Sequence, residues 1–169
     1  MSRLLSLILC CLLFGCAKPE PPKQLPDHFE GSLGDAYDAT FLTIDLQQEA
    51  GQLKGHYDIS RPGKPVEGDF TGTTAGNEVK LTLLVPETSQ KRLGWSDKLE
   101  LTLNLGEATQ VEIARQYEAI GEKVPPEIRA LGSIPQLGGW ALFSENGQAK
   151  KKLVVLYNLD FMKLHQSRR

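Results

Sequence analysis

The stretch Val79-Lys80-Leu81-Thr82-Leu83 decides the fold, because apolar and polar residues alternate in it with a period of two. The same pattern recurs as Leu99-Glu100-Leu101-Thr102-Leu103. Alternation of this kind predicts strands with one face buried and the other in water. On the outward face of a sheet that pairs these strands, Lys80 is expected to lie beside Glu100.

Further strands are predicted on both sides of this pair. Each is a run of alternating or β-branched residues between turns rich in Gly, Pro, Asn or Asp. Asn146-Gly147 is a strong signal for a tight hairpin between the last two strands. The last strand is apolar on both faces, as a central or helix-covered strand would be. The predicted strands are 37–47, 53–59, 66–73, 79–85, 99–105, 137–144 and 152–159.

A glycine and an aromatic residue two positions later share a face in two of these strands. The pairs are Gly55 with Tyr57 and Gly68 with Phe70. An aromatic ring on a neighbouring strand can cover bare glycine backbone, and the glycine lets the sheet coil.

The period changes to that of a helix after the fifth of these runs. Thr109 and Glu112 have the spacing of a capping box, and an apolar stripe follows at helical intervals: Ile113, Tyr117, Ile120 and Val124. A second short helix is predicted from Pro126 to Leu131. We expect the stripe to cover the mouth of the sheet. The alternative is a helix that stands off the sheet and offers the stripe to a partner.

These patterns predict a mainly β (α+β) fold. It is an antiparallel meander sheet or a small partly closed barrel, with a helical insert around 109–131. Residues 27–169 are long enough for a single β-rich domain.

The N-terminus has the features of a secretory signal. Arg3 precedes an apolar run of about a dozen residues, too short for the ~20 that a spanning helix needs. The run ends in Leu13-Phe14-Gly15-Cys16, which resembles the bacterial lipobox. The resemblance implies that residues 1–15 are a signal peptide and that Cys16 becomes lipidated. The alternatives are a plain signal peptide and an N-terminal spanning helix.

Residues 16–26 are expected to tether the domain to the membrane. Prolines dominate this segment and favour extended polyproline II, about 30 Å long at ~3.1 Å per residue. Ala17 follows the cysteine, where an Asp tends to retain Gram-negative lipoproteins in the inner membrane. The resemblance therefore favours the outer membrane, with the domain facing the periplasm.

Composition and spacing give no sign of a cofactor, a metal or nucleic acid. The formal net charge is −2, and all three cysteines lie at or before Cys16. None of His28, His56 and His165 has metal-ligand spacing. We expect His56 on the surface and residues 27–30 in a solvated segment, and no catalytic residue is predicted.

The loop 86–97 is the first candidate for a partner site, because it is longer than a hairpin needs. It contains Lys91, Arg92 and Trp95, and Trp and Arg are favoured binding anchors. Tyr117 on the helical stripe is the second candidate. The alternative for Trp95 is that it caps the end of the sheet.

The sequence therefore predicts a lipid-anchored envelope protein that is not an enzyme, and that binds or assembles with an envelope protein partner. One alternative is a lipocalin-like carrier of a small apolar ligand. The other is an enzyme whose site residues come from distant strands.

Overall fold

A computed structural model describes residues 23–34, 40–119, 121, 123–124, 126–129 and 133–158. The predicted signal peptide 1–15, Cys16 and most of the tether lie outside these residues. Ile120, Leu131 and the C-terminal tail also lie outside them.

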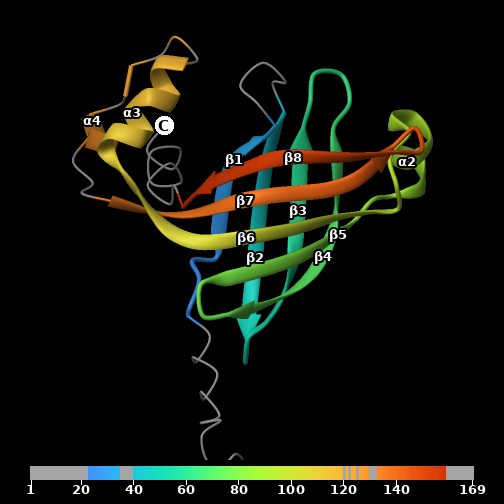
Figure 1. Cartoon of the computed structure of the whole chain (residues 1–169), viewed down its shortest axis with the longest axis horizontal. Helices are drawn as coiled ribbons and strands as arrows, with labels where there is room; N and C mark the ends of the chain where they lie inside the picture. Colours follow the sequence, from blue (N-terminus) through green and yellow to red (C-terminus); the bar gives the residue numbers. More distant parts are fainter. Residues whose placement is uncertain are drawn as a thin grey trace, which may run out of the picture.

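Eight antiparallel strands form a closed barrel in which each strand pairs with its neighbours in the sequence (Figure 1). The predicted mainly β fold and the meander are confirmed. The strands are β1 His28–Leu33, β2 Phe41–Glu49, β3 Gln52–Ser60, β4 Val66–Ala75, β5 Glu78–Leu84, β6 Lys98–Thr109, β7 Ser133–Glu145 and β8 Gln148–Tyr157.

The barrel is fully closed, so the prediction of an open sheet or a partly closed barrel is corrected. Closure depends on β1, which pairs with β2 on one side and with β8 on the other. The prediction of a solvated segment over residues 27–30, at the start of this strand, is therefore wrong. Phe29 and Leu33 of β1 are buried in the interior. Between them, a Cβ on Gly31 would lie 2.1 Å from the carbonyl oxygen of Val155, so only glycine allows this close approach.

The residues just before β1 also belong to the domain. Leu25 is buried in the main core, and its backbone N–H donates to Gln48 Oε1 at 2.9 Å. The Gln48 side-chain amide donates in turn to the carbonyl oxygen of Lys23 at 2.9 Å. Residues 23–27, which we call the strap, therefore pack against β2, whereas the sequence analysis ended the tether at Pro26.

The barrel interior is filled by apolar side chains from every strand. The inward positions are those that the alternation predicted, with Leu81 opposite Leu101 and Leu83 opposite Leu99. On the outward face Lys80 lies opposite Thr102, which corrects the expected pairing with Glu100. The largest side chains with under 2% exposure are Tyr57, Phe29, Phe70, Leu33, Leu42, Ile44, Ile59, Leu83, Leu99, Leu101 and Leu103.

The two glycine–aromatic pairs meet across β3 and β4, as the repeated pattern predicted. Gly55 lies opposite Phe70, and Tyr57 lies opposite Gly68. A Cβ on Gly55 would lie 1.9 Å from the carbonyl oxygen of Asp45, so the glycine permits the tight approach of β2. The Tyr57 hydroxyl donates to the Leu84 carbonyl at 2.7 Å. Burial, with a smaller contribution from the charge of Asp69, raises the pKa of Tyr57 to about 12.

The helical insert consists of α3 Gln110–Ala119 and α4 Pro126–Arg129. The predicted capping box is present. Glu112 Oε2 accepts from the backbone N–H and the hydroxyl of Thr109 at 2.7 and 2.8 Å, and the Glu112 N–H donates to Thr109 Oγ1 at 3.4 Å. These bonds favour the carboxylate and lower the pKa of Glu112.

The helix does not plug the barrel, which corrects the favoured expectation. Ile113 of α3 and Val124 pack instead in a second, smaller cluster, separate from the main core. The strand residues of this cluster, Ala108, Ile134 and Tyr157, occupy outward positions on β6, β7 and β8. The helix therefore covers part of the outer wall, and the mouth of the barrel is left to other residues. Figure 1 shows α3 and α4 beside one end of the strands.

The opposite end of the barrel is closed by the segment between β5 and β6. Most of the predicted loop 86–97 is the helix α2 Glu87–Leu93, which ends at Gly94 with φ 70°. Leu93 and Trp95 are both buried in the main core. The sequence alone predicts a long loop here, because a seven-residue helix has too little apolar periodicity to be recognised.

Candidate functional site

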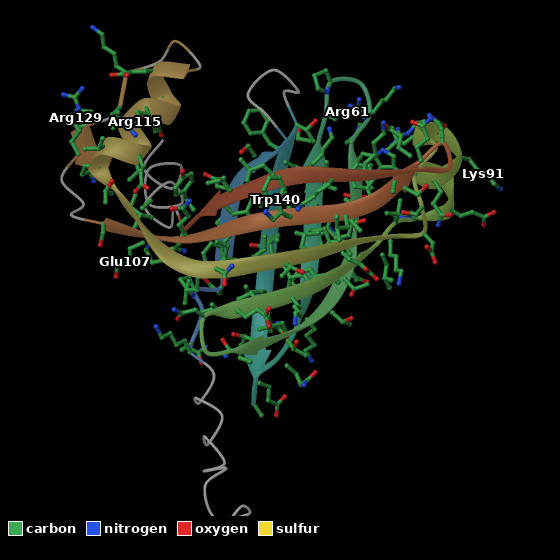
Figure 2. The ribbon with its side chains drawn as sticks, in the orientation of Figure 1. Arg61, Lys91, Glu107, Arg115, Arg129 and Trp140 are labelled. Carbon is green, nitrogen blue, oxygen red and sulfur yellow. The ribbon has the colours of Figure 1, made fainter. Side chains whose placement is uncertain are left out.

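The four residues predicted to bind a partner do not form one site. Figure 2 shows Lys91 on α2 at one end of the barrel, and Arg115 on α3, the helix that carries Tyr117, at the other. Tyr117 is half-buried and packs against the outer-wall cluster. Distance alone therefore prevents a joint contact with one small partner.

Trp95 caps the barrel end and offers its ring to no partner, since only 6% of it is exposed. Its ring centroid lies 5.2 Å from that of Phe143, and its Nε1 donates to Glu145 Oε1 at 3.2 Å. This agrees with the structural alternative considered for Trp95 and corrects the prediction of a binding anchor.

Lys91 and Arg92 are exposed and are engaged in local contacts. Lys91 Nζ lies 2.7 Å from Glu87 Oε1, one helical turn earlier. Arg92 Nη2 donates to the carbonyl oxygen of Pro65 and so holds α2 to the β3–β4 connection. The Lys91–Glu87 ion pair is at the surface, where such a pair contributes little to stability.

The outer wall of β7 and β8 carries an apolar surface that the sequence analysis did not single out. Trp140 lies directly opposite Leu153, and Leu142 is the next outward residue along β7. Their exposed fractions are 45%, 43% and 47%. We call these three residues the Trp140 patch. Figure 2 shows Trp140 on the barrel wall, between the two ends that carry α2 and α3.

Lysine side chains border the Trp140 patch. Lys151 lies opposite Leu142, and its ammonium nitrogen is 4.3 Å from the centroid of the Trp140 ring, a cation–π contact. On β6, Glu100 lies opposite Leu142 and pairs with Lys98 at 2.7 Å. The hydrogen bond and charge of Glu100 raise the pKa of Lys98.

The Trp140 patch continues the surface that α3 covers. Val155 is the next outward residue after Leu153 on β8, and it packs against the cluster beneath α3. The outer wall of β7 and β8 is therefore apolar along much of its length. The insert covers one part, and the Trp140 patch is the part left open.

A row of alternating histidine and aspartate crosses the outer wall of the first four strands. His28, Asp45, His56 and Asp69 lie directly opposite one another on β1 to β4. Nδ1 of His28 is 2.7 Å from Asp45 Oδ1, and Nδ1 of His56 is 3.3 Å from Asp69 Oδ1. His56 is exposed as predicted.

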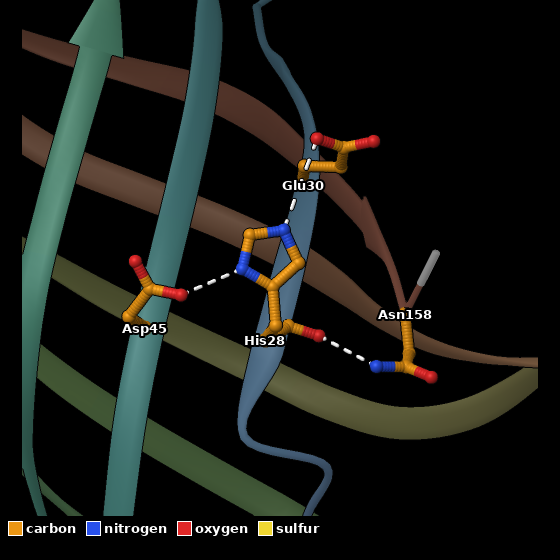
Figure 3. A network of polar contacts seen from close by, with 4 residues as sticks. All are labelled: His28, Glu30, Asp45 and Asn158. Atoms are coloured by element: carbon orange, nitrogen blue, oxygen red, sulfur yellow. Dashed lines mark hydrogen bonds and ion pairs between the residues drawn. The ribbon is translucent and has the colours of Figure 1, made fainter. Parts of the chain in front are cut away.

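His28 holds strands together at the seam of the barrel (Figure 3). Its side chain is only 11% exposed, and its Nε2 is 3.8 Å from Glu30 Oε2. Its carbonyl oxygen accepts from the Asn158 side-chain amide at 2.8 Å, which ties β1 to the end of β8. These contacts give His28 a structural role at the point where the barrel closes.

Two hollows lie away from the leucine-rich centre of the barrel. One of about 740 Å³ is lined mainly by polar side chains of β2 to β4, including Lys54, His56 and Asp69. The other, of about 400 Å³, lies at the insert and is lined by Gln110, Ala114, Glu118, Lys123, Val124 and Arg129. Among the described residues, no three His, Cys, Asp or Glu side chains gather as a metal site.

A signal for the Trp140 patch was present in the sequence. Trp140 and Leu142 alternate with the buried residues Ala141 and Phe143, so β7 is apolar on both faces there. The sequence alone predicted a strand that is apolar on both faces only for β8. Neither pattern tells which outward residues a helix covers, because that depends on where the insert packs.

Comparison of the chain with protein-family models, with curated proteins and with solved structures gives no match. The fold itself is a closed barrel of eight antiparallel strands in sequence order. This architecture is compatible with lipocalin-like carriers. Within the described ranges, none of the helices has the length and apolar character needed to cross a bilayer.

Proposed function

We propose that this protein is a lipid-anchored envelope protein, not an enzyme, that binds through the outer wall of its barrel. Lipidation at Cys16 is the anchor, and residues 16–22 connect it to the strap. The outer membrane, with the domain facing the periplasm, is the location that the sequence favours. The Trp140 patch is the binding surface.

One observation carries this proposal: apolar side chains are packed against one another in the interior, whereas apolar side chains on the outer wall are left exposed. The leucines, isoleucines and aromatic rings that line the interior are almost fully buried by one another. A carrier needs an apolar cavity of at least ~300 Å³. The apolar residues of the outer wall differ from those of the interior. Over two fifths of the surface area is exposed to solvent in each of Trp140, Leu142 and Leu153. Trp is among the residues that contribute most to binding surfaces.

The helical insert supports the same proposal. It shows that the outer wall of β6 to β8 already accepts an apolar cover, since Ile113 of α3 is only 4% exposed there. A second cover over the Trp140 patch would extend the same contact surface. The outward face of β3 is different in kind, because its residues Lys54, His56 and Asp58 are polar.

The test is site-specific photocrosslinking of the full chain in its own membranes. A benzophenone amino acid replaces Leu142 in one variant and Lys54, on β3 of the facing wall, in the other. We expect adducts at position 142 and few at position 54. The proposal is overturned if the two positions label equally, or if position 142 forms no adduct while the variant remains folded.

A further inference from the structure

We infer that the Trp140 patch docks on the bilayer that carries the anchor, with anionic phospholipid headgroups as its ligand. This inference rests on the proposed function, since it names the partner of the same surface. It places the barrel on its side against the membrane, with β7 and β8 toward the lipid.

The first support is the composition of the surface. Indole rings favour the membrane–water interface, because one part of the ring is apolar and the other polar. Here the leucines flank the indole of Trp140. Lys151 stands over the ring, with its ammonium placed to meet a phosphate. Juxtamembrane lysines are attracted to anionic lipid surfaces in this way.

The second support is the charge around the surface. Glu100, the carboxylate opposite Leu142, is 2.7 Å from Lys98 and is neutralised by it. The positive charge of Lys151 is therefore not offset by Glu100, and it gives the patch a positive edge. An anionic surface complements that edge, and a partner with a basic surface does not.

The third support is the size of the patch. A stable protein–protein interface needs about 800 Å² from each partner. Three partly exposed side chains on two strands form a smaller surface than that. A small patch is sufficient for docking on a bilayer, because the tether raises the effective concentration of the domain at the membrane to the millimolar range. Contacts that would be too weak for a free domain then hold it there.

The fourth support is the position of the patch relative to the anchor. Residues 16–22 can span at most about 25 Å between the proposed lipid and the strap. The strap leads into β1, which pairs with β8, so the patch lies on the strands next to the entry of the chain. The Gly34 N–H donates to the Leu153 carbonyl, which places Leu153 level with the end of β1. That is about 20 Å along the barrel from the strap, within the reach of a barrel lying on its side.

The experiment uses the full lipidated chain reconstituted into vesicles of phosphatidylcholine and phosphatidylglycerol with brominated acyl chains. Bromine quenches only those indoles that reach the acyl region. Trp95 is buried and serves as the internal reference, and Trp140 is the reporter. We expect at least a twofold loss of the Trp140 contribution, and no loss in the Trp140→Phe variant, which keeps Trp95 alone.

Two aspartate variants provide the matched comparison. Leu142→Asp places a carboxylate in the patch and should abolish quenching. Leu84→Asp makes the same change at a leucine that is 54% exposed on β5, two strands further round the wall, and should leave quenching intact. Removal of phosphatidylglycerol should weaken quenching severalfold, because Lys151 then loses its anionic partner.

The outcomes separate this inference from the proposed function. An unquenched Trp140 in brominated vesicles overturns membrane docking. The proposed function still stands if position 142 then crosslinks to a protein, and falls if it crosslinks to nothing. Protein-concentration-dependent shielding of Trp140 in detergent, with dimers in sedimentation, would assign the patch to a second copy of this chain and would also overturn the inference.

Discussion

Replacement of Leu101 by alanine tests how fully the barrel is packed. Leu101 is 1% exposed and lies opposite Leu81 in the centre of the interior. Truncating a leucine in a filled core costs the transfer free energy of the lost methyl groups plus a cavity term, about 3–4 kcal/mol in all. For a domain of this size that lowers the Tm by about 10 °C.

The assay is urea unfolding followed by circular dichroism, with Leu84→Ala as the control. Leu84 is also a strand leucine, but it is exposed, so its truncation should change the free energy of unfolding by less than about 0.5 kcal/mol. A loss below about 1.5 kcal/mol for Leu101→Ala would contradict a packed interior. It would mean that the leucine already borders open space and that the interior is hollow.

Three further predictions address the strap, the buried tyrosine and the anchor. A fragment that begins at Lys23 should be more stable in urea than one that begins at Asp27, by about 2–3 kcal/mol, because the shorter fragment loses the buried Leu25; equal midpoints would contradict the strap. The pKa of Tyr57 is raised to about 12, above the ~10 of an unfolded tyrosine, so its stabilising contribution is complete below pH 10 and is lost between pH 10 and 12. Absorbance at 295 nm should show that replacing Tyr57 by Phe removes a late-titrating tyrosine from the folded protein; an unchanged late phase in Tyr57→Phe would contradict the assignment. A palmitate analogue should label the wild type and leave Cys16→Ser unlabelled, and equal labelling of both would refute the lipobox interpretation.

The alternating strands were predictable because each buried face has a period of two. Leu81, Leu83, Leu99, Leu101 and Leu103 all point inward as expected. The glycine–aromatic pairs across β3 and β4 were also predictable, since each pair follows from the same repeat on adjacent strands. These are local patterns, and local patterns determine the side-chain positions along each strand.

Closure of the barrel was not predictable from the same rules. β1 is only six residues long, and Gly31 takes the inward position between Phe29 and Leu33, so only two apolar side chains mark its buried face. The strand is held by partners far away in the chain, such as Val155 on β8, and by the Asn158 side chain. Contacts between residues so far apart in the sequence cannot be recognised from the pattern within eight neighbouring residues.

The place of the helical insert was missed for a similar reason. The stripe that includes Ile113 predicts that one face is buried, and this is confirmed. It does not say which surface buries it. β6 and β7 extend together to Thr109 and Ser133, and they carry the insert onto their own outer wall. The uncovered Trp140 patch is a consequence of that placement and could not be predicted without it.

If this barrel is packed inside and binds on its outside, its interior has no room for an apolar ligand. The most direct measurement is a titration of the full chain with a naphthylamine probe that fluoresces only in apolar surroundings. We predict no saturable one-to-one binding in the interior, and only weak fluorescence that Leu142→Asp removes. Saturable one-to-one binding that survives Leu142→Asp would contradict a packed interior, because it would place the ligand inside the barrel.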